Sequence, residues 1–164
     1  MNAIIRLAAA LLPLTVTALS LAAPRQIDNE DGMTSPVLLA GRAARAVQPV
    51  AGKGRHIYFG IDDSFKASDA TAFTLEAEYF DGVSGELSLE FDGSDPSAPF
   101  SGAYTRAAQV IRMDGLKTWR KARFTLKGAR LDNSQNRSAD FRLVVAATEI
   151  AVSEVRLSRE ESKH

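Results

Sequence analysis

The side chains of this sequence best suited to ligand chemistry are aromatic rings, amides and guanidinium groups in its polar stretches. Tyr104 lies in a long stretch that contains several Gly and Pro residues, and Trp119 is the only tryptophan of the chain. Asn136 and Arg137 lie in a second polar stretch, residues 133–140. Aromatic rings can stack on the CH face of a sugar, while amide and guanidinium groups supply the donors and acceptors that hydroxyls need. These four residues are the predicted ligand contacts.

Each candidate also has a purely structural interpretation. By strand alternation, Trp119 shares a face with Lys121 and Arg123, which turns its ring toward solvent. A bulge before it would reverse this parity and place the ring over the end of the core. Asn and Ser are also residues that tight loops require for backbone reasons. The aromatic and polar groups therefore make a site only if the fold brings their loops together.

Four glutamates alternate with apolar residues in the two strand-like runs between residues 72 and 91. These runs predict a hairpin with one apolar and one acidic face. Clustered carboxylates can act as a general acid and base or bind a cation. However, a basic stripe follows on the run that begins at Thr118, and we expect the two stripes to neutralise each other as solvent faces. The glutamates are Glu76, Glu78, Glu86 and Glu90, and the basic residues are Lys121, Arg123 and Lys127.

Little in the sequence supports catalysis or a metal centre. Cysteine is absent and the two histidines are His56 and the terminal His164, so a zinc site lacks ligands. None of the HExxH, Walker, GxGxxG or GxSxG patterns occurs. The oxygen-rich loops at 62–64 and 92–95 could hold a structural calcium, although turns use the same residue types. We therefore predict no catalytic residues, no metal ligands and no cofactor, a structural calcium excepted.

Charge and length exclude several classes of protein. The 164 residues carry 20 basic and 20 acidic side chains, which argues against a nucleic-acid-binding protein and against a basic membrane-surface protein. Hydrophobic residues make up 45% of the chain, which is enough for one folded domain. We expect a monomer whose mature form has no membrane span.

The N-terminus has the anatomy of a secretory signal peptide. Arg6 precedes an apolar run that ends in small residues, with Ser20 and Ala22 at the −3 and −1 positions. Pro13 and hydroxyl residues interrupt this run, which is shorter than the roughly 20 residues that a membrane-spanning helix needs. We expect cleavage before Ala23, or one residue later, and export to the periplasm or the extracellular space.

After a signal peptide at residues 1–22, the chain divides into a flexible leader at 23–35, one domain at 36–158 and a charged tail at 159–164. Residues 37–47 fit either a short helix or a strand from Arg42, because Gly41 interrupts the helical pattern. From residue 55 onward, short apolar–polar alternations are separated by polar turns. This pattern predicts an all-β protein, an antiparallel β-sandwich of seven to nine strands.

Four segments of the domain resemble β-domains of secreted bacterial proteins. They read IYFGIDDSF at 57–65, EYFD at 78–81, TWRKARFTL at 118–126 and NRSADFR at 136–142. Together they are similar to galactose-binding-like jelly-roll domains of the carbohydrate-binding-module type, as appended to secreted bacterial glycoside hydrolases. The resemblance covers about residues 55–157 and implies two antiparallel sheets with ligand sites in the end loops or on a concave face. It also implies that a structural calcium is frequent among relatives.

The resemblance and the candidate residues together predict an exported, non-catalytic module that binds a glycan weakly through Tyr104, Trp119, Asn136 and Arg137. The alternative is a periplasmic or surface domain of the same fold that binds an envelope protein. A third is a small polysaccharide-active enzyme. Exposure of Tyr104 or Trp119 beside the other two residues would favour the first. Two carboxylates that face each other across a cleft would favour the third.

Overall fold

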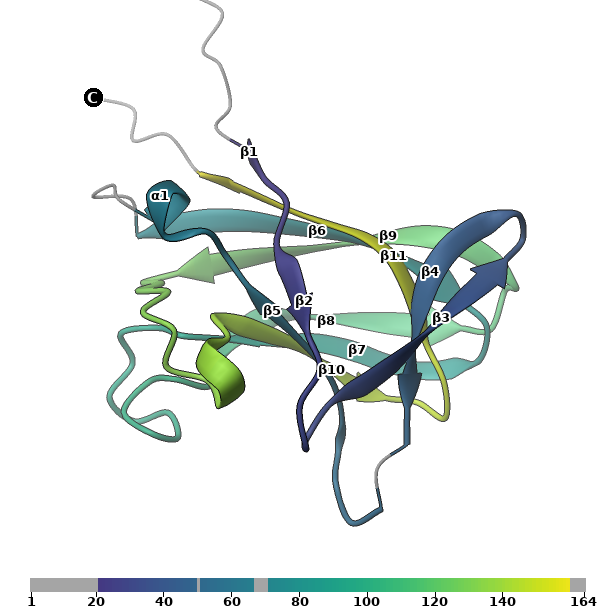
Figure 1. Cartoon of the computed structure of the whole chain (residues 1–164), viewed down its shortest axis with the longest axis horizontal. Helices are drawn as coiled ribbons and strands as arrows, with labels where there is room; N and C mark the ends of the chain where they lie inside the picture. The colour runs from purple at the N-terminus through teal and green to yellow at the C-terminus, as the bar shows by residue number, and fades with distance from the viewer. Residues whose placement is uncertain (1–20, 50, 67–70, 160–164) are drawn as a thin grey trace, which may run out of the picture.

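The computed structural model describes residues 21–49, 51–66 and 71–159, which form two antiparallel β-sheets packed face to face (Figure 1). The first sheet has the strand order β3-β4-β11-β6-β9, with β1 also pairing with β11, and the second has the order β2-β5-β10-β7-β8. The strands are β1 (Leu21–Ala22), β2 (Arg25–Ile27), β3 (Met33–Leu39), β4 (Arg42–Gln48), β5 (Arg55–Gly60), β6 (Ala72–Asp81), β7 (Ser84–Phe91), β8 (Thr105–Asp114), β9 (Thr118–Lys127), β10 (Phe141–Ala146) and β11 (Ala151–Arg159).

This architecture confirms the predicted antiparallel sandwich, with more strands than the predicted seven to nine. The additional strands include β1 and β2, which have two and three residues and are too short to show an alternation in the sequence. Two short helices, α1 (Asp63–Lys66) and η1 (Asn136–Ser138), lie in loops at one end of the sandwich, and the β3–β4 hairpin lies at the other end (Figure 1). In the described parts of the chain, no helix is long and apolar enough to cross a membrane.

Alternate residues of the long strands form the core between the sheets. Phe124 of β9 is fully buried, with Ala122 and Leu126 on the same face of the strand. Phe141, Leu143 and Val145 of β10 meet this layer from the second sheet. The period-2 pattern therefore predicted correctly which residues face inward, because side chains alternate between the two faces of a strand.

The predicted hairpin between residues 72 and 91 is wrong. Strands β6 and β7 follow one another in the chain, but β6 pairs with β9 and β11, whereas β7 pairs with β8 and β10. Both strands have one apolar face, and alternation identifies that face without identifying the strand's partner. The four glutamates are consequently divided between the outer faces of two different sheets.

The predicted compensation of the acidic stripe holds for the glutamates of β6. Glu76 lies 3.7 Å from the guanidinium of Arg123, and Glu78 lies 3.7 Å from the ammonium of Lys121. Glu90 of β7 instead binds arginines of its own sheet. These contacts support the interpretation of the β6–β9 charges as a solvated face.

Part of the segment predicted as a flexible leader, residues 23–35, forms strands. Strand β2 adds to β5, from Arg25 opposite Gly60 to Ile27 opposite Tyr58, and β3 begins at Met33. The segment that fitted either a helix or a strand is extended and forms β3 and β4. The polar composition of this segment did not predict strands, because these strands form by pairing with partner strands that lie elsewhere in the chain. Residues 1–20 of the predicted signal peptide and 160–164 of the predicted tail lie outside the described residues.

The loops predicted as calcium candidates use their carboxylates to close turns. Asp62 Oδ1 accepts hydrogen bonds from the backbone amide and the hydroxyl of Ser64, and Asp95 Oδ1 accepts the same pair from Ser97. Within the described residues, no group of three acidic or histidine side chains could hold a metal ion. These contacts match ordinary turn chemistry.

Candidate ligand-binding site

The outer face of the second sheet carries a row of polar side chains on neighbouring strands. Arg142 of β10 stands directly opposite Tyr58 of β5 on one side and Glu90 of β7 on the other, and Glu90 stands opposite Arg106 of β8. The residues that follow or precede them in the chain, such as Phe59 and Phe141, belong to the core. Because side chains alternate between the two faces of a strand, the polar row lies on the outer face of the sheet.

Arg142 is the centre of this row. Its Nε donates to Glu90 Oε2 at 2.8 Å, and its Nη1 donates to Asp31 Oδ2 at 3.0 Å and to the Tyr58 hydroxyl. The ring of Tyr104 lies 4.3 Å from the guanidinium carbon, a cation–π contact. The Arg142 side chain is only 16% exposed, so these contacts replace most of its hydration.

Burial and charge fix the protonation states around Arg142. Burial opposes the charged form of Arg142, but the hydrogen bonds to Glu90 and Tyr58 outweigh it and raise the pKa of the guanidinium. Burial and the hydrogen bond to Asp31 raise the pKa of Tyr58 well above its ordinary value. Burial and the nearby Arg142 lower the pKa of His56, which therefore stays neutral at neutral pH.

The turn between β2 and β3 forms one wall beside this row. Asn29 and Gly32 exchange backbone hydrogen bonds of 3.0 and 3.2 Å, which brings Glu30 and Asp31 to the tip of the turn. A side chain at Gly32 would place its Cβ only 2.6 Å from the carbonyl oxygen of His56, so glycine is required for this close approach. The turn is then fixed by Asp31, which accepts the hydroxyl of Tyr58 at 2.7 Å.

A cavity of about 370 Å³ opens between this turn, the row and the loops at the end of the sandwich. Its aromatic wall is formed by Tyr104 and Phe100, whose ring centroids lie 5.7 Å apart in an edge-to-face arrangement. The lining residues are Glu30, Asp31, Lys53, Glu90, Pro99, Phe100, Tyr104, Ser134, Asn136 and Arg142.

Phe100 has two features that are unusual for an aromatic residue. The residue is 82% exposed, and its backbone has a left-handed φ of 53°. Left-handed backbone is costly for a bulky residue, and such strain is often retained where a side chain must be presented in a defined position. Phe100 therefore presents an apolar ring at the mouth of a polar cavity.

The cavity also contains polar groups that are free to bind a ligand. The Lys53 ammonium, the Ser134 hydroxyl and the Asn136 side-chain amide make no hydrogen bond or ion pair with another described residue. By contrast, the Asp31 carboxylate and the Arg142 guanidinium are occupied by one another and by their neighbours. The arrangement offers a ring for stacking and uncommitted donors and acceptors beside it.

The structure brings three of the four predicted ligand contacts together. Tyr104 and Asn136 line the cavity, and the Asn136 backbone amide donates to the Tyr104 hydroxyl at 3.3 Å. Arg137 lies at the rim, where its Nε is 3.6 Å from Glu30. Loops more than 30 residues apart in the chain thus meet at one end of the sandwich, as the prediction required.

Trp119 is not part of this site. It lies on the first sheet, where its indole N–H donates to the carbonyl of Leu39 at 3.3 Å and its ring packs against Phe80 and Arg42. Its outward parity was predicted correctly, but the β3–β4 hairpin folds over it. Trp119 therefore attaches this hairpin to the sheet, which is a structural role.

The prediction missed Phe100, Arg142, Asp31 and Lys53 as lining residues. Phe100 was visible as an aromatic in the same loop as Tyr104, but its exposure depends on a left-handed turn that composition does not reveal. Arg142 meets Glu90 and Asp31 across 52 and 111 residues of chain. Contacts over such separations have no local signal.

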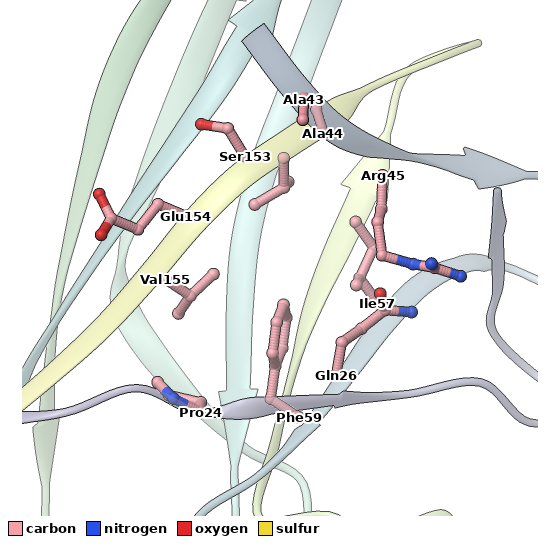
Figure 2. Close-up of a pocket in the computed structure, with 11 residues that line it drawn as sticks. Pro24, Gln26, Ala43, Ala44, Arg45, Ile57, Phe59, Ser153, Glu154 and Val155 are labelled. Carbon is pink, nitrogen blue, oxygen red and sulfur yellow. The ribbon is translucent and has the colours of Figure 1, made fainter. Parts of the chain in front are cut away.

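A second cavity, of about 320 Å³, opens between the sheets on one side of the sandwich (Figure 2). At this place β4 pairs with β11 only through Ala46 and Arg45, and the register of β11 with β6 shifts after Val152. Ile57, Phe59 and Val155 point into it (Figure 2). This lining belongs to the core.

The polar groups at the rim of this inter-sheet cavity are already engaged. Arg45 donates to Asp28 and Thr34, and Gln26 donates to the same two side chains. A further cavity of about 560 Å³, at the end of the sandwich, is lined by polar residues such as Arg25, Asp62 and Asn133 but by no aromatic ring. Neither combines an aromatic platform with free polar groups.

Comparisons with known proteins support the fold. No family model and no curated protein sequence matches the chain. The structure is similar to the CBM22-1 xylan-binding domain of Paenibacillus barcinonensis Xyn10C, with 8% identity, a TM-score of 0.53, and coverage of 91% of this chain and 100% of that one. It is also similar to the CBM22-1–GH10 modules of Clostridium thermocellum Xyn10B, solved with xylohexaose, with 11% identity, a TM-score of 0.50, and coverage of 87% and 27%. The chain thus has the β-sandwich fold of carbohydrate-binding modules.

Proposed function

We propose that this protein is a non-catalytic module that binds a glycan in the cavity between Phe100, Asn136 and Arg142. The observation that carries the proposal is the exposed Phe100 ring beside the free polar groups of Lys53, Ser134 and Asn136. A sugar ring has an apolar CH face and a rim of hydroxyls, so it matches a platform with donors and acceptors around it. The shared fold with a xylan-binding domain agrees with this assignment.

The charges of the cavity favour a neutral glycan. The nitrogen atoms of Arg142 are engaged by Glu90, Asp31 and Tyr58, so this guanidinium has little capacity left to bind a ligand carboxylate. The lining contains three acidic side chains and two basic ones, which gives no excess of positive charge. Binding should therefore change little between low and physiological salt, because uncharged ligands are not subject to ionic screening.

Arg142 binds the carboxylates of both Asp31 and Glu90, which supports a binding role over a catalytic one. Asp31 and Glu90 lie on opposite sides of one guanidinium, each within 3.0 Å of one of its nitrogens. Each carboxylate is held against the cavity wall by this guanidinium, so neither is free to approach a glycosidic bond as an acid or a base. This pair is suited to holding the cavity wall in place.

Titration calorimetry with a panel of soluble oligosaccharides, xylohexaose among them, tests the proposal. Phe100→Ala should weaken the affinity measured for the wild type about tenfold, the value of one lost stacking contact. Asn136→Ala should also weaken the affinity relative to that of the wild type. Leu38→Ala is the matched control, because Leu38 is an exposed apolar residue on β3 outside the cavity. Absence of binding to every glycan would contradict the proposal, and a steep salt dependence would point instead to an anionic polysaccharide or an acidic protein partner.

We also propose that the protein is exported as a monomer to the periplasm or the extracellular space. The support is the predicted signal sequence with Ser20 and Ala22 before the cleavage point. Edman sequencing of the exported protein should find Ala23, or the next residue, at the N-terminus, whereas Met1 would contradict cleavage. Cleavage before Ala23 would remove the two residues of β1, which pair only with the end of β11 at Leu157 and Ser158.

A further inference from the structure

We propose that Arg130, held by the buried carboxylate of Asp92, is a positioning residue that fixes the Phe100 wall of the glycan cavity. The inference rests on the proposed function for its binding readout. Asp92 follows β7 directly, and its side chain is fully buried and does not line the cavity. It can therefore affect a ligand only through the groups that it holds.

The first wall is the turn that presents Phe100. Arg130 Nη2 donates to Asp92 Oδ1 at 3.1 Å and to the carbonyl oxygen of Ser101 at 2.9 Å. Phe100, Ser101 and Gly102 all have left-handed backbone, with φ of 53°, 56° and 102°. This backbone is costly at Phe100 and Ser101, which are not glycine, and the guanidinium supplies a charge-assisted hydrogen bond at Ser101.

The second wall is the loop that carries Ser134 and Asn136. Asp92 Oδ2 accepts the backbone amides of Asp132 at 2.7 Å and of Ser134 at 3.2 Å. The backbone carbonyl of Asp92 also accepts the amides of Arg130 and Leu131. The same carboxylate thus fixes one wall through its Oδ2 and the other through its Oδ1 and Arg130.

The paired contacts connect both loop walls of the cavity to one buried carboxylate. An ionised carboxylate has two oxygens and can accept several donors at once, which suits it to join two segments. Arg130 is suited to its task because its planar group reaches two acceptors with fixed geometry, whereas a lysine ammonium is a single point on a flexible stem. The Arg130→Lys variant therefore keeps the positive charge beside Asp92 and loses the defined bridge to Ser101.

A double-mutant cycle between Arg130 and Phe100 tests the inference. The affinity for xylohexaose, or for the oligosaccharide of the panel that binds the wild type best, is measured by calorimetry. Arg130→Lys should weaken it about tenfold, and Phe100→Ala with Arg130→Lys should weaken it no more than Phe100→Ala alone. Arg112→Lys is the control, since Arg112 is a more exposed arginine of β8 outside the cavity. Additive losses in the double variant, or unchanged affinity of Arg130→Lys, would overturn the inference.

A second measurement does not depend on any ligand. In the wild type, the rings of Phe100 and Tyr104 are close enough to give nuclear Overhauser effects between their protons. These should disappear in Arg130→Lys while the core signals remain, and they should persist in Arg112→Lys. If no glycan binds the wild type, the proposed function fails, and this measurement alone decides the role of Arg130. Persistence of the effects in Arg130→Lys would overturn it.

Discussion

Replacing Arg142 by methionine should lower the free energy of unfolding by about 3 kcal/mol. Methionine keeps most of the length and packing of the side chain but removes its charge. Asp31 and Glu90, which are 17% and 15% exposed, would then lose the cation that lies between them. Asp31 would keep the Tyr58 hydroxyl and Glu90 would keep Arg106 at 3.8 Å. The loss of the central cation from two poorly hydrated carboxylates still costs far more than the loss of an exposed ion pair.

The same variant should weaken glycan binding in the proposed cavity, because Asp31 would keep Tyr58 but lose its cation, and the ring of Tyr104 would lose its cation–π contact. Urea unfolding monitored by circular dichroism measures the stability. Arg156→Met is the matched control, since Arg156 is half-exposed and pairs with Glu154 on its own strand. The control should change the stability by less than about 0.5 kcal/mol. Equal effects of the two substitutions would contradict a central role for Arg142.

Replacing Phe124 by alanine should lower the free energy of unfolding by about 3–5 kcal/mol. Phe124 has no exposed surface and lies in β9 opposite Leu75 of β6, in the layer between the two sheets. Its removal would leave a void that strands paired on both sides cannot easily close.

Phe100→Ala is the internal control for this prediction, because it deletes the same side chain at a position that is 82% exposed. Its unfolding midpoint should stay close to that of the wild type, whereas that of Phe124→Ala should fall strongly. A wild-type midpoint for Phe124→Ala would mean that the register of β9 differs from the one described. The contrast also separates the effect of Phe100 on binding from any effect on folding.

The sequence alone predicted the class of the fold and the inward face of most strands. Alternation at Ala122, Phe124 and Leu126 identified a buried face, and the structure confirms it. The prediction of the buried face succeeds because side chains alternate between the two faces of a strand, whatever the rest of the chain does. A few consecutive residues are enough to show this alternation. The outward parity of Trp119 was predictable for the same reason.

The tertiary structure decided which strands are partners and hence where the site lies. The pattern for β6 and β7 was correct, yet their pairing was not, because an apolar face can pack in either sheet. The polar leader became β2 and part of β3 because β5 and β4 offered free edges. The partner of a strand depends on contacts between residues that are distant in the sequence, and local composition does not predict these contacts.

The candidate site divides in the same way. Tyr104, Asn136 and Arg137 were identifiable from residue type, since aromatic and amide groups in loops are available to a ligand. That they meet, and that Trp119 lies on the other sheet under a hairpin, depended on how the loops are brought to one end. Arg142 was decided entirely by tertiary structure, because its role arises from Asp31, Tyr58 and Glu90 on three other segments. The sequence determines which side chains are available for binding. Long-range strand pairing determines which of them lie close enough together to form a site.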